Sequence, residues 1–245
     1  MEPGERTSRA GWFATTHWSQ VLAAGGQSNP DATVALEALC RTYWYPLYAY
    51  LRRQSYGVHD AQDLTQSFFV HLLAGERLQT VHPAKGKFRS FLLASLKNFL
   101  NNEHDRRQAL KRGGQITFVS VDEALGEEQF QREPAHTETP DKAFEQSWAV
   151  TLLGSVLAQL RSEYVRESKA EVFEALQVYL AGDGGGAPYV ATGQRLGLGE
   201  SGVKMAVLRL RRRFGELLRT TIAHTVTRPE EVEEEIRHLF AAVSR

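Results

Sequence analysis

Apolar residues recur along this chain mostly at spacings of three and four, which is the period of an amphipathic helix. No convincing alternation of apolar and polar positions, which would indicate strands, interrupts this pattern. In the first half of the sequence the apolar faces trace helices at 36–51, 59–73 and 88–110. We expect Pro46 to kink or divide the first of these, because proline lacks the amide hydrogen used inside a helix. The pattern predicts an all-α fold.

Glycine and proline divide the chain into parts. From Gly113 to Pro140 no helical period is sustained, so we interpret this segment as a linker with at most one short turn near 121–125. Further helices are expected at 16–24, 141–160, 164–180 and 229–243, together with a glycine-rich loop at 182–186. The predicted organisation is an N-terminal extension at 1–29, a helical domain at 30–112, the linker at 113–140, a second helical domain at 141–222 and a C-terminal extension at 223–245.

The segment from Tyr189 to Phe214 has the layout of a helix-turn-helix, whose second helix lies in the major groove of DNA. A short helix is followed by a turn at 197–199 and by a longer helix that ends in basic residues. Leu196, Val203, Val207 and Leu210 are expected to form the packed face. The positions left more exposed are Glu200, Ser201, Lys204, Met205, Leu208, Arg209 and Arg212, and the basic run Arg211, Arg212 and Arg213 is expected to contact phosphates.

Charge is segregated along the chain although the formal net charge is zero. The segments 85–112 and 195–219 are basic, and the segment 122–145 between them is acidic. Such an asymmetry says more about partners than the total does. It agrees with two nucleic-acid-binding parts separated by an acidic linker.

The first basic segment interleaves Phe88, Phe91 and Phe99 with lysine, arginine and asparagine. Aromatic side chains in a basic groove can stack on unpaired bases, but aromatics at helical spacing are more often part of a core, and we favour the core. In the preceding helix, Asp60 and Asp63 share one face, since residues three apart are neighbours on a helix. A polar docking face for a basic partner is the preferred interpretation of that pair.

Several functional classes are disfavoured. The lone Cys40 excludes an internal disulfide and a cysteine-based zinc cluster, and the sequence contains no apolar run of about 18 residues. We therefore expect a cytoplasmic protein without membrane association. A metal hydrolase built on His59, Asp60, Asp63 and His71 is a remote alternative, because His71 lies about two helical turns beyond Asp63. No catalytic residue, metal or cofactor is predicted.

Taken together, these motifs resemble the extracytoplasmic-function group of bacterial sigma-70-type sigma factors over roughly residues 30–222. ALEALCRTYWYPLYAYLRR and DAQDLTQSFFVHLL look like the first two helices of sigma region 2. FRSFLLASLKNFLNNEHDRR looks like the helix that reads and melts the −10 promoter element, and residues 189–214 look like the −35-reading half of region 4. The order and separation of the motifs carry the resemblance more than any one of them.

The resemblance implies a role in transcription initiation, with core RNA polymerase and promoter DNA as partners and with no catalytic activity of the chain itself. An anti-sigma factor is a further implied partner. The polymerase-docking positions would be Asp60, Asp63, Gln66 and Ser67. The −10 positions would be Lys97, Asn98, Asn101, Asn102, Arg106 and Arg107. The −35 positions would be Glu200, Ser201, Lys204, Met205, Leu208, Arg209, Arg211 and Arg212, with Met205 and Leu208 offering apolar contact to thymine methyls.

The chain departs from the family at the docking face, where relatives usually carry acids in place of Gln62 and Ser67 and an aliphatic residue in place of Thr65. One hypothesis is that a kinase restores the missing charge by phosphorylating Thr65. The simpler alternative, which we favour, is that these polar residues lie on a solvated face. In the helix-turn-helix, Gly193 stands where relatives favour alanine, and interior glycine costs a helix about 1 kcal/mol.

Three further expectations concern how the parts work together. As flexible coil the linker would span roughly 30 Å. The polymerase would therefore have to hold apart the two DNA readers, which are the −10-binding domain at 30–112 and the −35-binding domain at 141–222. In the free protein the acidic linker could instead fold against the basic faces and weaken DNA binding. The C-terminal extension is expected to pack on region 4, or alternatively to regulate. The main rival function is a stand-alone helix-turn-helix transcriptional regulator.

Overall fold

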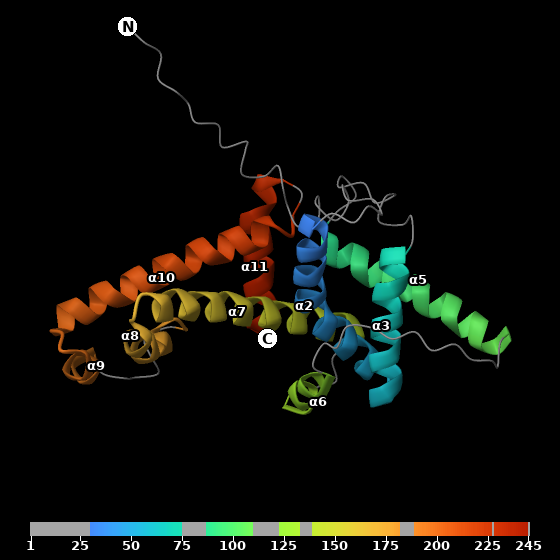
Figure 1. Ribbon diagram of the computed structural model, residues 1–245, viewed down its shortest axis with the longest axis horizontal. Coiled ribbons are helices and arrows are strands. Elements are labelled where there is room, and N and C mark those ends of the chain that lie inside the picture. Colours follow the sequence, from blue (N-terminus) through green and yellow to red (C-terminus); the bar gives the residue numbers. More distant parts are fainter. Residues whose placement is uncertain are drawn as a thin grey trace, which may run out of the picture. The chain divides into compact units, whose positions relative to one another are not determined.

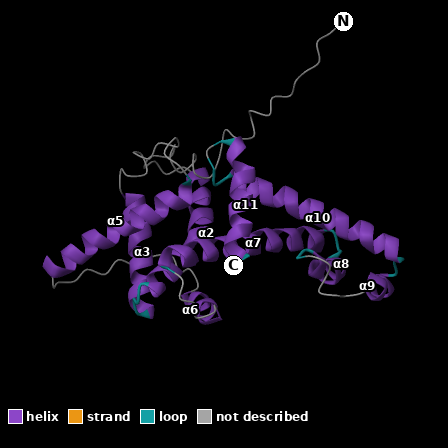
Figure 2. Ribbon diagram, turned by 180° about the vertical axis from the view of Figure 1, so that it is seen from behind, coloured by secondary structure: helices purple, strands orange, loops and turns teal. Residues whose placement is uncertain are grey.

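The computed structural model describes residues 30–74, 87–109, 123–132, 139–181, 189–226 and 228–244. Within these ranges the chain is made of helices joined by turns and loops, and it contains no strand (Figure 2). The predominantly helical fold agrees with the apolar spacing of the sequence. None of the described helices combines the length and apolar character that a membrane span requires. The predicted helix at 16–24 and the glycine-rich loop at 182–186 lie outside the described residues.

Three long helices form the first part of the structure (Figure 1): α2 (Pro30–Arg53), α3 (Val58–Ala74) and α5 (Phe88–Ala109). Each buries the apolar face that its sequence predicts, with Leu47, Phe68 and Leu96 almost completely inaccessible to solvent. Pro46 lies inside α2 and does not divide it, contrary to one of the two expectations for that residue.

The linker is more ordered than predicted, because it contains a helix of ten residues, α6 (Glu123–Arg132). This helix packs against α2 through Gly126, where an added Cβ would lie only 2.6 Å from a ring carbon of Trp44. Phe130 receives the guanidinium of Arg52 on its ring face at 4.9 Å. The prediction of a single short turn was therefore wrong.

The next helix, α7 (Pro140–Arg166), is longer than predicted, and the expected break between 160 and 164 does not occur. The chain turns instead at Ser168, whose φ of 59° places it in the left-handed region. Two short elements follow, α8 (Ala170–Leu176) and the 3-10 helix η3 (Gln177–Tyr179).

The C-terminal part contains α9 (Tyr189–Leu196), α10 (Glu200–Ala223), the 3-10 turn η5 (Pro229–Glu231) and α11 (Val232–Val243). The chain divides into two compact units. The first unit takes in the described residues up to Thr151 and from Ile222 onward, and the second, here called the helix-turn-helix unit, is Leu152–Thr221. The division falls within α7 and α10, whereas the sequence placed it in the linker.

Candidate nucleic-acid interface

The turn between α9 and α10 has the geometry of a helix-turn-helix. Gly197 adopts a positive φ of 66°, which favours glycine. The amide of Leu198 donates a hydrogen bond of 2.8 Å to the carbonyl of Gly193. A Cβ at Gly193 would lie only 2.5 Å from the carbonyl oxygen of Leu198. The expectation that Gly193 merely weakens α9 is thus corrected, since the close passage of the turn requires a residue without a side chain.

One face of α10 is packed and the opposite face is open. Val203, Val207 and Leu210 are buried, as the sequence predicts. Two large apolar side chains, Met205 and Leu208, are 53% and 58% exposed. They share the open face with exposed polar and charged residues, namely Glu200, Ser201, Lys204, Arg209 and Arg212. Large apolar side chains that are exposed to solvent can mark a binding surface for a partner with apolar groups.

Tyr179 of η3 supports the helix-turn-helix from the preceding segment. Its ring stacks on Tyr189 with centroids 4.9 Å apart, and its hydroxyl forms a hydrogen bond of 2.7 Å with the Thr192 hydroxyl. Arg211 donates two hydrogen bonds, of 3.0 and 2.8 Å, to the Tyr179 carbonyl. Thr192 and Arg211 therefore have structural roles. Arg211, which the sequence assigned to DNA phosphates, is engaged within the protein.

Three other cations of α10, Lys204, Arg212 and Arg213, make solvent-exposed ion pairs. Lys204 lies 2.6 Å from Glu200, and this hydrogen-bonded carboxylate raises the pKa of the lysine. Arg212 pairs with Glu216 at 3.1 Å. Arg213 reaches Glu163 at 2.7 Å. Exposed pairs of this kind contribute only about 0–1 kcal/mol, so the cations remain able to exchange a carboxylate for a phosphate.

The closed turn, the packed face and the open face of α9 and α10 agree with the layout that the sequence predicts for a helix-turn-helix. No known family model matches the chain, and no curated protein or solved structure is significantly similar to it.

The predicted −10 surface lies on α5. Lys97, Asn98, Asn101 and Asn102 are all exposed on this helix. Arg106 and Arg107 belong to α5, but their side chains lie outside the described residues. The aromatic residues occupy other faces, because Phe88 and Phe99 are buried at 3% and 5% exposure and pack against Tyr43 and Phe68. The core interpretation is confirmed for Phe88 and Phe99, which are not available for base stacking, whereas Phe91 is half-buried.

The predicted polymerase-docking face lies on α3. Asp60, Asp63 and Ser67 are exposed and Gln66 is half-buried. Thr65, however, is completely buried and donates a hydrogen bond of 2.7 Å to the Ala61 carbonyl one turn earlier. A kinase cannot reach a hydroxyl in that position. The hypothesis that Thr65 is phosphorylated is therefore wrong, and so is the favoured alternative for this residue, because Thr65 does not lie on a solvated face.

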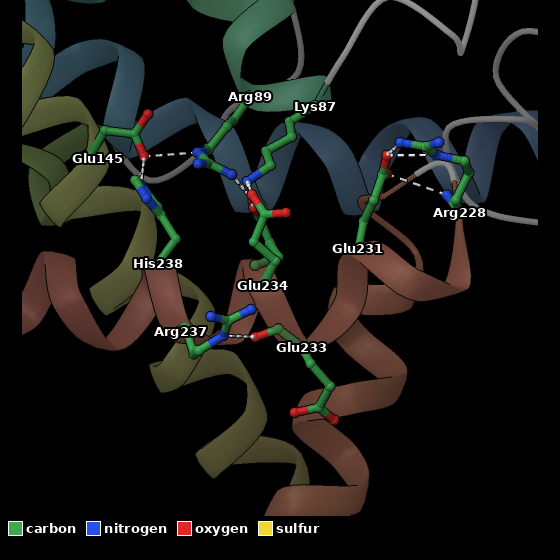
Figure 3. Close-up of polar contacts among 10 residues, drawn as sticks. Lys87, Arg89, Glu145, Arg228, Glu231, Glu233, Glu234, Arg237 and His238 are labelled. Atoms are coloured by element: carbon green, nitrogen blue, oxygen red, sulfur yellow. Dashed lines mark hydrogen bonds and ion pairs between the residues drawn. The ribbon is translucent and has the colours of Figure 1, made fainter.

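A cluster of charged residues that sequence reasoning missed joins α5, α7 and α11 (Figure 3). Arg89 of α5 is only 4% exposed and donates to Glu145 of α7 at 2.7 Å. It also pairs with the buried Glu235 of α11 and lies 4.7 Å above the ring of Trp148. His238 of α11 lies 2.8 Å from the same Glu145 carboxylate.

The cluster shows where the C-terminal extension packs. The extension was expected to pack on the second helical domain, 141–222, and α11 does contact the first turns of α7, which belong to that range. It also contacts α5, which the sequence did not predict, and all these contacts lie within the first unit. One sequence signal pointed to this contact. Glu235 interrupts an apolar stripe that includes Val232 and Leu239, and a buried acid in such a stripe requires a cationic partner.

No group of three or more histidine, cysteine, aspartate or glutamate side chains arranged for a metal ion occurs among the described residues. His59, Asp60, Asp63 and His71 lie on α3 without forming such a group.

Proposed function

We propose that this protein is a sigma factor, which binds core RNA polymerase and directs it to promoters that carry −35 and −10 elements. The observation that carries the proposal is the set of exposed polar residues on α5, Lys97, Asn98, Asn101 and Asn102, whose helix is otherwise fixed by buried aromatics. A DNA-binding repressor with a single helix-turn-helix has no use for this second surface. The family resemblance gives both surfaces a role in one process.

The −35 element would be read in duplex form by α10. Its open face offers Met205 and Leu208 to apolar groups in the major groove, where the thymine methyl is the only such group on a base edge. Arg209 and Lys204 flank them and can donate to guanine, which is worth about 1–3 kcal/mol of discrimination for a good bidentate contact.

The −10 element would be captured as single strand by α5. Asparagine side chains both donate and accept hydrogen bonds, so they can read the base edges that strand separation exposes. Lys97 would contact the backbone, whose phosphates supply most of the affinity. Neither step makes or breaks a covalent bond. The strands stay open because the captured bases are held.

Core polymerase would join the two readers by docking on the exposed acids of α3. Each reader alone binds modestly, and holding both on one enzyme raises the effective concentration of each at its element. The rival function, a stand-alone regulator, would work through α10 alone.

Affinity for purified core polymerase tests the proposal. We expect the wild-type chain to co-elute with core polymerase, and Asp63→Arg to lower the affinity about tenfold or more, since like charges at an interface cost several kcal/mol. The matched control is Glu171→Arg, the same charge reversal at an exposed position of α8. Tight binding of the wild-type chain to duplex DNA, without any affinity for polymerase, would instead identify a stand-alone regulator.

A further inference from the structure

Three described carboxylates of the acidic segment 122–145 pair with three different cations of the first unit. Glu127 of α6 pairs with Arg52 of α2 at 3.1 Å. Glu145 of α7 accepts from Arg89 of α5, and Asp141 in the first turn of α7 pairs with Lys97. Two of the three cations, Arg89 and Lys97, belong to the basic segment 85–112 that the sequence shows.

The pair of Asp141 and Lys97 differs from the others because Lys97 belongs to the predicted −10 surface. Lys97 and Asp141 are 44% and 51% exposed, so the pair lies at the rim of the unit, in contact with solvent. The ammonium of Lys97 also lies 5.9 Å from the ring of Tyr50. Burial raises the pKa of Tyr50 to about 12, and the negative charge of Asp141 adds to the rise.

The position of Asp141 is fixed by buried ion pairs of its own helix, α7. One turn further along α7, Glu145 is bonded to Arg89, which also pairs with Glu235 of α11. Breaking a buried pair of this kind costs several kcal/mol, whereas an exposed pair contributes about 0–1 kcal/mol. The position of α7 is therefore fixed, while the contact of Asp141 with Lys97 can open.

We propose that Asp141 is a built-in competitor for Lys97, which the phosphates of single-stranded promoter DNA must displace before the −10 surface can bind. This inference rests on the proposed function. Carboxylate and phosphate are both anionic acceptors for an ammonium group, so the two cannot occupy the same face of Lys97 at once. The consequence is that the free protein binds single-stranded DNA more weakly than its α5 surface alone would allow.

The test is binding of a fluorescein-labelled single-stranded DNA of mixed sequence and about 15 nucleotides, a length typical of single-strand sites. Anisotropy is measured at low salt for the full chain and for Asp141→Asn, which keeps the shape and removes the charge. We expect the variant to bind about two- to fivefold more tightly, the range that an exposed pair allows. Glu230→Gln, the same loss of one charge at an exposed position in η5, controls for net charge and should change the affinity less.

A double-mutant cycle decides whether the effect passes through Lys97. In a Lys97→Gln background, Asp141→Asn should give no gain beyond that of the Glu230→Gln control. An equal gain in DNA affinity in both backgrounds overturns the proposal. The proposal is also overturned if Asp141→Asn brings no gain in affinity, or if neither the wild type nor the variant binds the DNA. Asp141→Ser, which also keeps a polar first-turn side chain, gives the same measurement if the asparagine variant is unstable.

Core-polymerase binding separates this proposal from the proposed function. Wild type and Asp141→Asn should bind polymerase equally, because Asp141 is not on the α3 face. If neither binds polymerase, the sigma-factor proposal fails, while the competition for Lys97 is still decided by the DNA measurement.

Discussion

Replacing Gly193 by alanine is expected to destabilise the helix-turn-helix unit, although the same replacement stabilises most helices. An alanine Cβ at this position would lie 2.5 Å from the Leu198 carbonyl oxygen and 3.4 Å from a methyl of Val203. The carbonyl belongs to the backbone of the turn and cannot rotate away as a flexible side chain can. Either the turn moves or the hydrogen bond from Leu198 to Gly193 breaks.

The expected loss follows from three contributions. Better helix propensity gains about 1 kcal/mol. Overpacking costs about 1–3 kcal/mol, and weakening the hydrogen bond that closes the turn costs about 1 kcal/mol. The net effect is a destabilisation of about 1–3 kcal/mol.

Gly154 provides a matched control within the same unit. It lies on an exposed face in the interior of α7, and an added Cβ would meet nothing within 4 Å. Gly154→Ala should therefore stabilise the unit by about 1 kcal/mol. The same replacement of glycine by alanine is thus expected to lower the free energy of unfolding at position 193 and to raise it at position 154.

Urea denaturation followed by circular dichroism measures both free energies of unfolding. Hydrogen exchange with mass spectrometry locates the change, since peptides of α9 and the turn should exchange faster only in Gly193→Ala. If Gly193→Ala matched Gly154→Ala in stability, the close passage of the turn would be refuted.

Three further predictions concern single residues. Glu235→Gln should cost the first unit about 3–5 kcal/mol, because it leaves the buried Arg89 with one carboxylate fewer; tryptophan fluorescence during denaturation measures this. Thr65→Glu should destabilise by several kcal/mol rather than mimic a phosphate, because it buries a carboxylate, and loss of helical signal at lower urea checks it. Hydrogen bonds from Arg213 lower the pKa of Glu163 below its ordinary 4.5, so their contribution is present above that pH and lost as pH falls through the lowered pKa. Glu163→Gln should therefore flatten the acid loss of stability, by at most about 1 kcal/mol.

The two helices α9 and α10, their turn and their packed face could be predicted from the sequence because these signals are local. The turn glycine and the spacing of Val203, Val207 and Leu210 lie within a few residues of one another, so periodicity alone places them. The buried position of Thr65 was also within reach, since Ala61, Leu64 and Phe68 mark the buried face on which it falls. We predicted an exposed residue because threonine is polar. Burial is tolerated because the Thr65 hydroxyl donates to the Ala61 carbonyl in the preceding turn.

The charged cluster and the position of α6 could not be predicted, because their partners are distant in sequence. Arg89 and Glu235 are brought together only when α11 folds back onto the first unit. From the sequence, Arg89 was one more cation in a basic segment. Docking of α6 depends on Gly126 fitting against Trp44, a match of shapes that hydrophobic spacing does not encode.

Transcription in vitro tests the central claim most directly. Core polymerase would be supplied with a pool of templates randomised upstream of a fixed transcribed region, with and without this protein, and the transcribed templates would be sequenced. If the protein is a sigma factor, transcription will depend on it and the transcribed templates will be enriched in two separated elements. The double variant Met205→Ala with Leu208→Ala should alter the upstream element only. Transcription that is unchanged by adding the protein would show that it is not a sigma factor.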